Sequence, residues 1–210
     1  MKKNNKAKIS FLASAAIIVA LSEFFLRFYF GFCNTVLMKE DSNCEYMAQP
    51  SQSRFRFRNM IKYNSFSMRS DEIDSASLII LGFGDSVING GVQTDHDSLA
   101  TTILSKSFTK LYQQKVQFLN ISAGSWGPDN CYAYLQKYGN FNAKSIYLFV
   151  SSHDAYDNMN FQKIVGVNES FPSSQYSLAI YEMFDRYLKP RLISYFNAST
   201  NYHEVEPLGI

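Results

Sequence analysis

The sequence contains few of the residues that build metal sites, and it lacks the charge pattern of proteins that bind nucleic acid. Of its 210 residues only three are cysteine and three are histidine, and they are scattered without metal-ligand spacing. The net charge at pH 7 is +2, and the chain has no basic stripe of the kind that contacts phosphates. We therefore expect no metal site, no cofactor and no nucleic-acid partner.

Internal repeats and low-complexity segments are also absent from the sequence, which argues against a repeat protein. Hydrophobic residues make up 46% of the chain and aromatic residues 16%, which is enough to fill a core and excludes global disorder. The length suits one domain of ordinary size with additional segments.

One long apolar stretch, residues 9 to 32, follows a lysine-rich tail of residues 1 to 8. As a helix it would extend about 36 Å, enough to cross a hydrocarbon core of about 30 Å. Glu23 and Arg27 interrupt it late and four residues apart, so they are able to pair near the membrane interface. We expect a transmembrane anchor with its amino terminus in the cytoplasm, because lysines gather before the stretch.

A cleaved signal peptide is the alternative interpretation of this stretch. Residues 9 to 22 alone have the length of a signal-peptide core, but no A-x-A-like cleavage site follows them. In either case the rest of the chain is expected in the periplasm or outside the cell. Cys33 and Cys44 could then form a disulfide, while Cys131 would be a small buried residue.

Residues 33 to 74 are expected to form a juxtamembrane linker and an entry segment before a domain at 75–210. Within the entry segment, the alternation Arg54-Phe55-Arg56-Phe57-Arg58 predicts a short strand with phenylalanines inward and arginines outward.

A run of apolar, mostly β-branched or leucine residues from 78 to 81 leads into Gly84-Asp85-Ser86. This pattern predicts a buried strand that delivers Ser86 to a tight turn at its carboxyl end, where α/β sheets place their chemistry. A serine in such a turn can expose its hydroxyl while nearby backbone N–H groups face the same space.

The rest of the chain alternates expected helices with expected strands. Strands are predicted at residues 116–121 and 145–150, and helices at about 98–114, 129–138 and 174–192, the last ended or kinked by Pro190. Strands that alternate with helices imply an α/β fold with a parallel sheet and right-handed crossovers.

Three ordered segments resemble the conserved blocks of the SGNH (GDSL-type) hydrolases. Gly84-Asp85-Ser86 resembles the first block, the segment from Asn120 to Pro128 the second, and Ser151-Ser152-His153-Asp154 the third, Gly-x-Asn-Asp. Residues 64 to 69 resemble the Asn-Ser-x-Gly-x-Arg segment that precedes these blocks in membrane-anchored members, with Ser67 in place of the glycine. The resemblance covers roughly residues 60 to 160.

The resemblance implies a flavodoxin-like parallel sheet with flanking helices and a serine ester hydrolase or acyl transferase. Ser86 would be the nucleophile in a turn with Asp85, and the backbone of Ser125 or Gly124 would supply an oxyanion donor. His153 stands at the position of the family's oxyanion asparagine, next to Asp154. Envelope-facing members of the family act on acyl esters of cell-surface polysaccharides, often acetyl groups, which makes an acylated glycan the expected substrate.

The chain departs from the family at its end, where the closing Asp-x-x-His block supplies the general base. The only late histidine is His203, and Thr200 stands where the aspartate would be. We therefore expect an incomplete SGNH-like domain in which His203 is a weak candidate for the base. The alternative is a catalytically impaired module that binds glycan or an envelope partner, with Trp126 and Tyr156 stacking on sugars.

Overall fold

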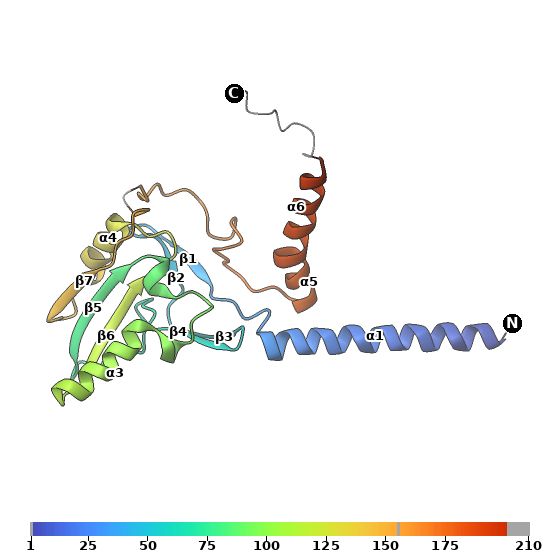
Figure 1. The fold of residues 1–210 in the computed structure, drawn as a ribbon, viewed down its shortest axis with the longest axis horizontal. Helices are drawn as coiled ribbons and strands as arrows, with labels where there is room; N and C mark the ends of the chain where they lie inside the picture. The colour runs from blue at the N-terminus through green and yellow to red at the C-terminus, as the bar shows by residue number, and fades with distance from the viewer. Residues whose placement is uncertain (1, 155, 201–210) are drawn as a thin grey trace, which may run out of the picture. The chain divides into compact units, whose positions relative to one another are not determined.

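The computed structural model describes residues 2–154 and 156–200, and the chain divides into two compact units (Figure 1). The α/β unit comprises Asn34–Gln175, and the helical unit combines Met1–Cys33 with the chain from Tyr176 onward. The expected boundary before residue 33 lies one residue from the observed one, whereas no boundary falls at residues 74 and 75, because the segment predicted as a linker folds with the α/β unit.

A three-stranded parallel sheet forms the centre of the α/β unit, in the order β6-β5-β7. Its strands are β5 (Leu78–Gly84), β6 (Val116–Ser122) and β7 (Ser145–Leu148). Gly84 pairs with Ser122 on one side of β5, and Phe83 pairs with Leu148 on the other. The predicted α/β architecture with a parallel sheet is therefore confirmed, with β5 as the central strand.

Two crossover helices cover opposite faces of this sheet. Helix α3 (Ala100–Tyr112) places Leu104 and Phe108 against Ile80. Helix α4 (Pro128–Tyr138) places Tyr134 in the larger core with Leu81. Successive residues of β5 thus point to different helices, because side chains alternate along a strand.

Two antiparallel hairpins precede the sheet, in the segment where a linker was expected. The first joins β1 (Met38–Asp41) to β2 (Glu45–Ala48), and the second joins β3 (Gln52–Arg56) to β4 (Asn59–Tyr63). Members of both hairpins are buried in the main hydrophobic core, among them Cys44, Tyr46, Met47 and Ile61.

The second hairpin reverses the predicted orientation of its side chains. Arg56 is buried, with 1% of its surface exposed, whereas Phe55 and Phe57 are half-buried. Phe57 and Arg58 have φ angles of 48° and 68° and form the two-residue turn, so the strand ends at Arg56. The alternation of arginine and phenylalanine in the sequence continues past the end of the strand into this turn. It therefore predicted the wrong side chains to face inward.

The two edges of the sheet differ in how their backbone is covered. On β6 the outward N–H groups of Val116, Phe118 and Asn120 donate to side-chain hydroxyls, at 2.9, 2.8 and 2.8 Å; the acceptors are Thr109, Ser105 and Ser70. On β7 every residue is exposed, and the exposure continues through Phe149 and Val150. One edge is therefore closed to further strands and the other is open.

The helical unit begins with α1 (Lys2–Phe30), of which Lys8–Phe30 is long and apolar enough to span a membrane. It also contains α5 (Ala179–Met183), a π-helical turn η2 (Phe184–Leu188) and α6 (Lys189–Thr200). These three elements form one run, so the helix begins and ends later than the predicted 174–192. Pro190 does not end it, because the wide turn before the proline accommodates the lost backbone donor.

The three cysteines are free thiols. The disulfide between Cys33 and Cys44 that the sequence allowed is therefore not formed in this structure. Burial raises the pKa of Cys44 to about 12. Cys131 is buried in the core, as predicted.

Candidate functional site

Ser86 lies exposed at the point where β5 leaves the sheet. It is the first residue of the short helix α2 (Ser86–Asn89), and the Asp85 carboxylate accepts the N–H of Val87 at 2.8 Å. A side chain at Gly84 would come within 3.0 Å of the Phe149 carbonyl oxygen, so the glycine lets β7 approach this turn closely. The predicted strand, turn and serine are therefore present, with Asp85 as the cap that shapes the turn.

A buried polar network holds α2 on the neighbouring strand β6. The Asn89 side-chain amide donates to the Ser122 hydroxyl and to the Ser122 carbonyl, both at 3.0 Å. The Asn120 amide donates to the Ile88 carbonyl at 2.7 Å, and the Ser122 hydroxyl donates to Asn120 at 2.5 Å. Since each of these buried amides has partners, the network stabilises the position of the Ser86 turn.

The loop after β6 carries Gly124 and Ser125 and is held from beneath by β2. The Tyr46 hydroxyl donates to the Gly124 carbonyl at 2.7 Å and lies 3.2 Å from the Ser125 carbonyl. Because a trans peptide places its C=O and N–H on opposite sides, the N–H of Ser125 points away from Tyr46, out of the core. Ser125 itself is exposed.

Serine adopts a left-handed backbone conformation at three positions of this unit, and at Ser51 the φ angle is 53°. Ser125 has φ 57° and Ser67 has φ 63°, both in the left-handed region. Of the positions where the SGNH resemblance implies glycine, which include Ser151, only Ser67 and Ser125 have a positive φ. The structure thus keeps the backbone geometry of a glycine there, and the side chain adds strain.

The loop after β7 contains His153 and Asp154. Asp154 is buried and accepts the Ser151 N–H at 2.5 Å and the Ser151 hydroxyl at 3.2 Å, so its carboxylate closes the turn. The His153 side chain is exposed, and its carbonyl accepts the N–H of Tyr156 at 2.9 Å.

The loops after the three strands meet at the carboxyl edge of the sheet. A side chain at Gly127 would come within 1.9 Å of the Asp157 carbonyl oxygen, so these two loops touch through their backbones. Asp129 joins them as well, because its carboxylate accepts the N–H of Met159 at 2.6 Å. Burial, together with nearby Asp154, Asp129 and Asp85, raises the pKa of the Cys131 thiol to about 12.

That set of carboxylates shows how the site is assembled. Asp85 follows β5, Asp129 follows β6 and Asp154 follows β7, and all three act on one buried thiol. The predicted residues Asp85, Gly124, Ser125, His153 and Asp154 lie in the loops that follow the carboxyl ends of β5, β6 and β7, the same edge of the sheet at which Ser86 follows β5.

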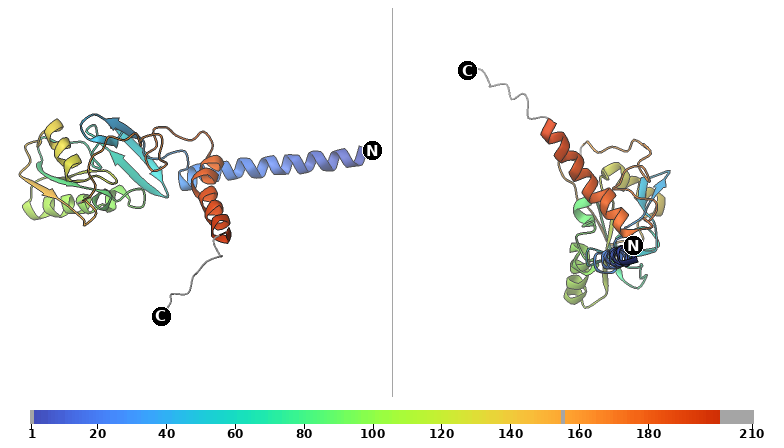
Figure 2. Two further views of the ribbon diagram at one scale, coloured as in Figure 1. Left: turned by 90° about the horizontal axis from the view of Figure 1, so that it is seen from above. Right: turned by 90° about the vertical axis from the view of Figure 1, so that its right-hand side faces the viewer.

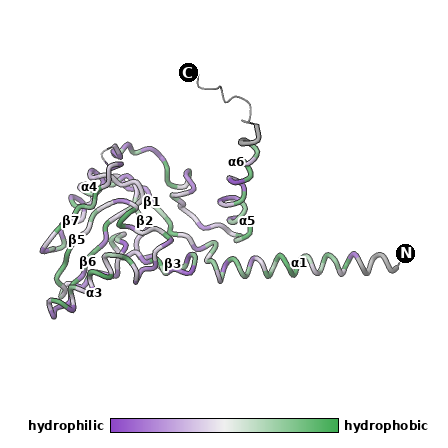
Figure 3. Tube along the Cα trace, in the orientation of Figure 1, coloured by the Kyte–Doolittle hydropathy of each residue, from purple (hydrophilic) through white to green (hydrophobic). Residues whose placement is uncertain are grey.

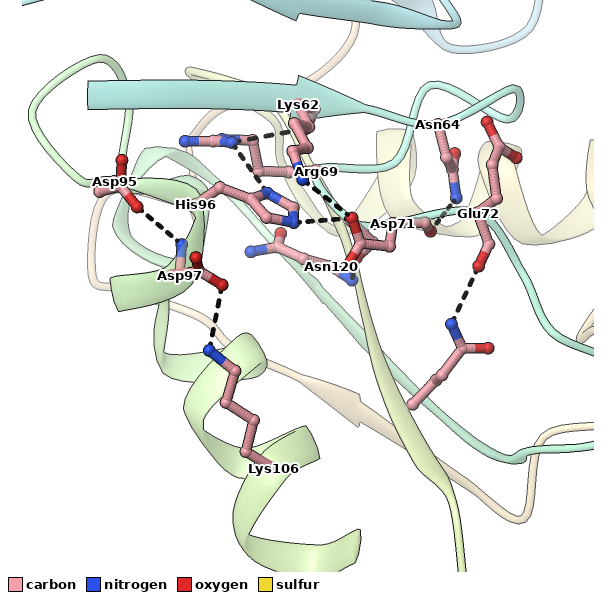
Figure 4. A network of polar contacts seen from close by, with 12 residues as sticks. Lys62, Asn64, Arg69, Asp71, Glu72, Asp95, His96, Asp97, Lys106 and Asn120 are labelled. Carbon is pink, nitrogen blue, oxygen red and sulfur yellow. Dashed lines mark hydrogen bonds and ion pairs between the residues drawn. The ribbon is translucent and has the colours of Figure 1, made fainter. Parts of the chain in front are cut away.

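A general base for Ser86 is missing from the part of the chain that the structure describes. In residues 2–154 and 156–200, no hydrogen bond joins Ser86 to a histidine. His96 is buried and contacts Asp71 at 3.2 Å and Arg69 at 3.4 Å (Figure 4). His203 lies outside the described residues. The same described residues contain no group of three or more potential metal ligands.

The two aromatic residues expected to stack on sugars have different environments. Trp126 is 2% exposed and donates its indole N–H to the Tyr46 carbonyl at 3.0 Å, so it belongs to the core. Tyr156 is 86% exposed, on the same loop as His153. Of the two, only Tyr156 is available to a ligand.

Sequence reasoning missed Tyr46 and Asp129, the residues that position the second and third loops. Tyr46 lay in the segment taken for a linker, and β2 has only four residues, too few for a clear period. Asp129 was expected only as the start of a helix. A signal was present in Gly127-Pro128-Asp129, since proline and an acidic residue both favour the first turn of a helix.

Comparisons with protein-family models, with curated proteins and with solved structures give no match for this chain.

Proposed function

We propose that the α/β unit is an SGNH-type serine ester hydrolase or acyl transferase. The observation that carries the proposal is the placement of Ser86: an exposed hydroxyl at the carboxyl end of the central strand, flanked by the loops after β6 and β7. Its turn is supported by a satisfied polar network, which is the preorganisation that a nucleophile needs.

In the proposed reaction the Ser86 hydroxyl attacks the carbonyl carbon of an ester. The C–O bond to the serine forms as the carbonyl oxygen becomes an oxyanion, and the proton of the serine passes to a base. In this proposal the N–H of Ser125, directed away from Tyr46, would donate to that oxyanion together with the N–H of Ser86 and with His153. Loss of the alcohol leaves an acyl-serine, which water or an acceptor hydroxyl then cleaves.

We propose His203 as the base of this mechanism and His153 as an oxyanion donor. A hydroxyl without a base is a poor nucleophile, and loss of a catalytic triad lowers kcat by about a million-fold in a well-studied protease. His153 is exposed and on the loop adjacent to the Ser86 turn.

For the helical unit we propose that α1 anchors the chain in a membrane. The amino terminus would lie in the cytoplasm and the α/β unit in the periplasm or outside the cell. An ester on an acylated cell-surface polysaccharide, such as an acetyl ester, is the substrate class that this placement favours.

Labelling with a fluorophosphonate probe tests the hydrolase proposal. We expect the native chain to be labelled and Ser86→Ala to lose all labelling, because the probe reacts only with an activated serine. Ser152→Ala is the matched control, an exposed serine on the neighbouring loop whose loss leaves labelling unchanged. Absence of labelling in a natively folded chain would overturn the proposal.

A second candidate is a module that binds glycan without cleaving it. The exposed Tyr156 ring, on the loop after β7, favours it, since aromatic faces stack on sugars. We expect Tyr156→Ala to abolish retention on an acetylated-glycan column if the unit only binds. A chain that shows labelling at Ser86 would exclude the purely binding module.

A further inference from the structure

The helix from Ala179 to Thr200, formed by α5, η2 and α6, carries an apolar stripe along its exposed side. The stripe residues are spaced by three or four positions, which keeps them on one face. All of them are exposed: Tyr181, Phe184, Leu188, Leu192 and Tyr195. We call these five residues the stripe.

The start of this helix is capped by a residue of α1. The Glu23 carboxylate accepts the N–H groups of Ala179 and Ile180, at 2.8 and 3.0 Å. Arg27 donates to the same carboxylate at 2.6 Å and also to the Ser177 carbonyl. The backbone N–H groups at the start of this helix thus have hydrogen-bond partners within the unit. Such partners are required where no water is available, as in the apolar part of a bilayer.

A second contact joins the helix to the end of α1. Glu182 is fully buried and accepts the N–H of Cys33 at 2.5 Å. The rings of Phe32 and Tyr187 meet edge to face, with centroids 5.6 Å apart. Residues 23 to 33, which span the end of α1 and the three residues after it, therefore hold the helix at one defined level along α1.

That level coincides with a belt of exposed aromatic residues on α1. Phe24, Phe25, Phe28 and Tyr29 are all exposed there, in the last turns of the possible membrane span. Aromatic residues favour the boundary between hydrocarbon and headgroups. Figures 1 and 2 show the helix crossing the axis of α1 rather than continuing it, and Figure 3 shows apolar residues along both.

An apolar hollow of about 740 Å³ lies between α1 and the start of the helix. It is lined almost wholly by apolar side chains, including Ala16, Val19, Ala20, Leu178, Tyr181 and Phe184. In water such a hollow is unfavourable, whereas lipid acyl chains would fill it at no desolvation cost.

We propose that the helix from Ala179 to Thr200 lies flat in the surface of the bilayer that α1 crosses. The stripe enters the boundary between headgroups and acyl chains, and Arg191, which flanks it, reaches the lipid phosphates, while Lys189 pairs with Asp185 at 3.1 Å. Lipid is the occupant because the stripe is apolar and aromatic with cations at its sides, the composition of interfacial helices. The inference rests on the proposed membrane anchor, and it is independent of catalysis at Ser86.

Tryptophan quenching by brominated lipid tests this placement in the full chain. The chain is reconstituted in vesicles of phosphatidylcholine and phosphatidylglycerol, with or without dibrominated acyl chains. Leu192→Trp adds a reporter on the stripe, and we expect bromine to remove about half of its emission, since interfacial helices bury their apolar face in the acyl boundary. The native Trp126, which is buried in the α/β unit, provides the baseline.

Two further variants give the controls. Ser194→Trp is the matched control, because residues two positions apart point to different sides of a helix; its emission should stay at the level without bromine. Leu12→Trp reports insertion of α1. Quenching at Leu12 without quenching at Leu192 would overturn the surface placement while the anchor stands, as would equal quenching at Leu192 and Ser194. A Leu12→Trp reporter that is not quenched would overturn the anchor and the surface placement together.

Discussion

The hydroxyl of Tyr46 lies 2.7 Å from the carbonyl oxygen of Gly124. This contact links the first hairpin to the loop that presents the Ser125 N–H. Because the carbonyl is fixed inward, the N–H of the same peptide is fixed outward, where the proposed oxyanion would form. The hairpin is therefore a support for the site and not a spacer.

Removal of that hydroxyl should affect both stability and reactivity. We expect Tyr46→Phe to lower the free energy of unfolding by about 1 kcal/mol, the net worth of one hydrogen bond. We also expect the rate of fluorophosphonate labelling at Ser86 to fall several-fold, because the loop loses its orientation. Tyr134→Phe is the matched control: its hydroxyl bonds the Phe66 carbonyl at 2.6 Å, away from this loop. Equal labelling rates in the two variants would contradict the role of Tyr46.

Restoring glycine at a left-handed position should stabilise the α/β unit. Ser67 has φ 63°, and its buried hydroxyl has no hydrogen-bond partner within the described part of the chain. We expect Ser67→Gly to raise the free energy of unfolding by about 1 kcal/mol, measured by urea denaturation, because the left-handed strain disappears. Ser67→Ala removes the hydroxyl and keeps the strain, so it should gain less. A loss of stability in Ser67→Gly would show that the turn is not strained.

The buried His96 predicts how stability depends on pH. Burial lowers the pKa of His96, and Arg69 and Lys62 lower it further, while Asp71 opposes them. The folded chain therefore binds fewer protons than the unfolded chain in the window below about pH 6.5. The contribution of the neutral His96 to the free energy of unfolding is fully present above that pH. It falls as the pH drops through the window, by at most about 1.4 kcal/mol per pH unit for one proton.

Replacing the imidazole isolates this effect. We expect His96→Asn to be less stable at pH 7.5, because the contacts to Asp71 and Arg69 are lost, but to show a smaller decline in stability between pH 6.5 and 5.5. Denaturation curves at several pH values measure both quantities. If His96→Asn lost as much stability between pH 6.5 and 5.5 as the native chain, the pH dependence would have to come from another titratable group.

The open edge of β7 should promote self-association of the chain. Ile146 is exposed in β7 and Val150 is exposed two residues after its end, along an uncharged edge that is a template for pairing with another chain. We expect Val150→Lys to lower the concentration-dependent light scattering several-fold relative to the native chain. Leu111→Lys removes an equally exposed apolar residue from α3 and should leave the scattering unchanged. A similar decrease in both variants would indicate general surface hydrophobicity and not pairing at the edge.

The elements that the sequence predicted well are those with a clear period. The strands at residues 78–84 and 116–122 and the helix at 128–138 were expected within a few residues of their bounds. A buried strand appears in the sequence as an apolar run, and a helix packed on a core appears as an amphipathic stripe. The positions of these elements can therefore be predicted from the order of apolar and polar residues alone. The serine at the end of β5 could be located for the same reason.

What the sequence could not predict depends on contacts between distant segments. The four-residue strands of the first hairpin have no measurable period, and their burial depends on the core that they join. The start of α5 at Ala179 depends on Glu23, more than 150 positions earlier in the chain. The alternation of arginine and phenylalanine extends into the tight turn at Phe57 and Arg58 without a break, and nothing in it distinguishes the buried Arg56 from its neighbours.

The hydroxyl groups along β6 have a further consequence for hydrogen exchange. An edge strand normally leaves half of its amides to water, and they exchange quickly. Here Thr109, Ser105 and Ser70 accept the outward amides of β6. In deuterium labelling β6 should therefore retain its protons as an interior strand does, and a topology deduced from protection alone would place β6 in the middle of a wider sheet.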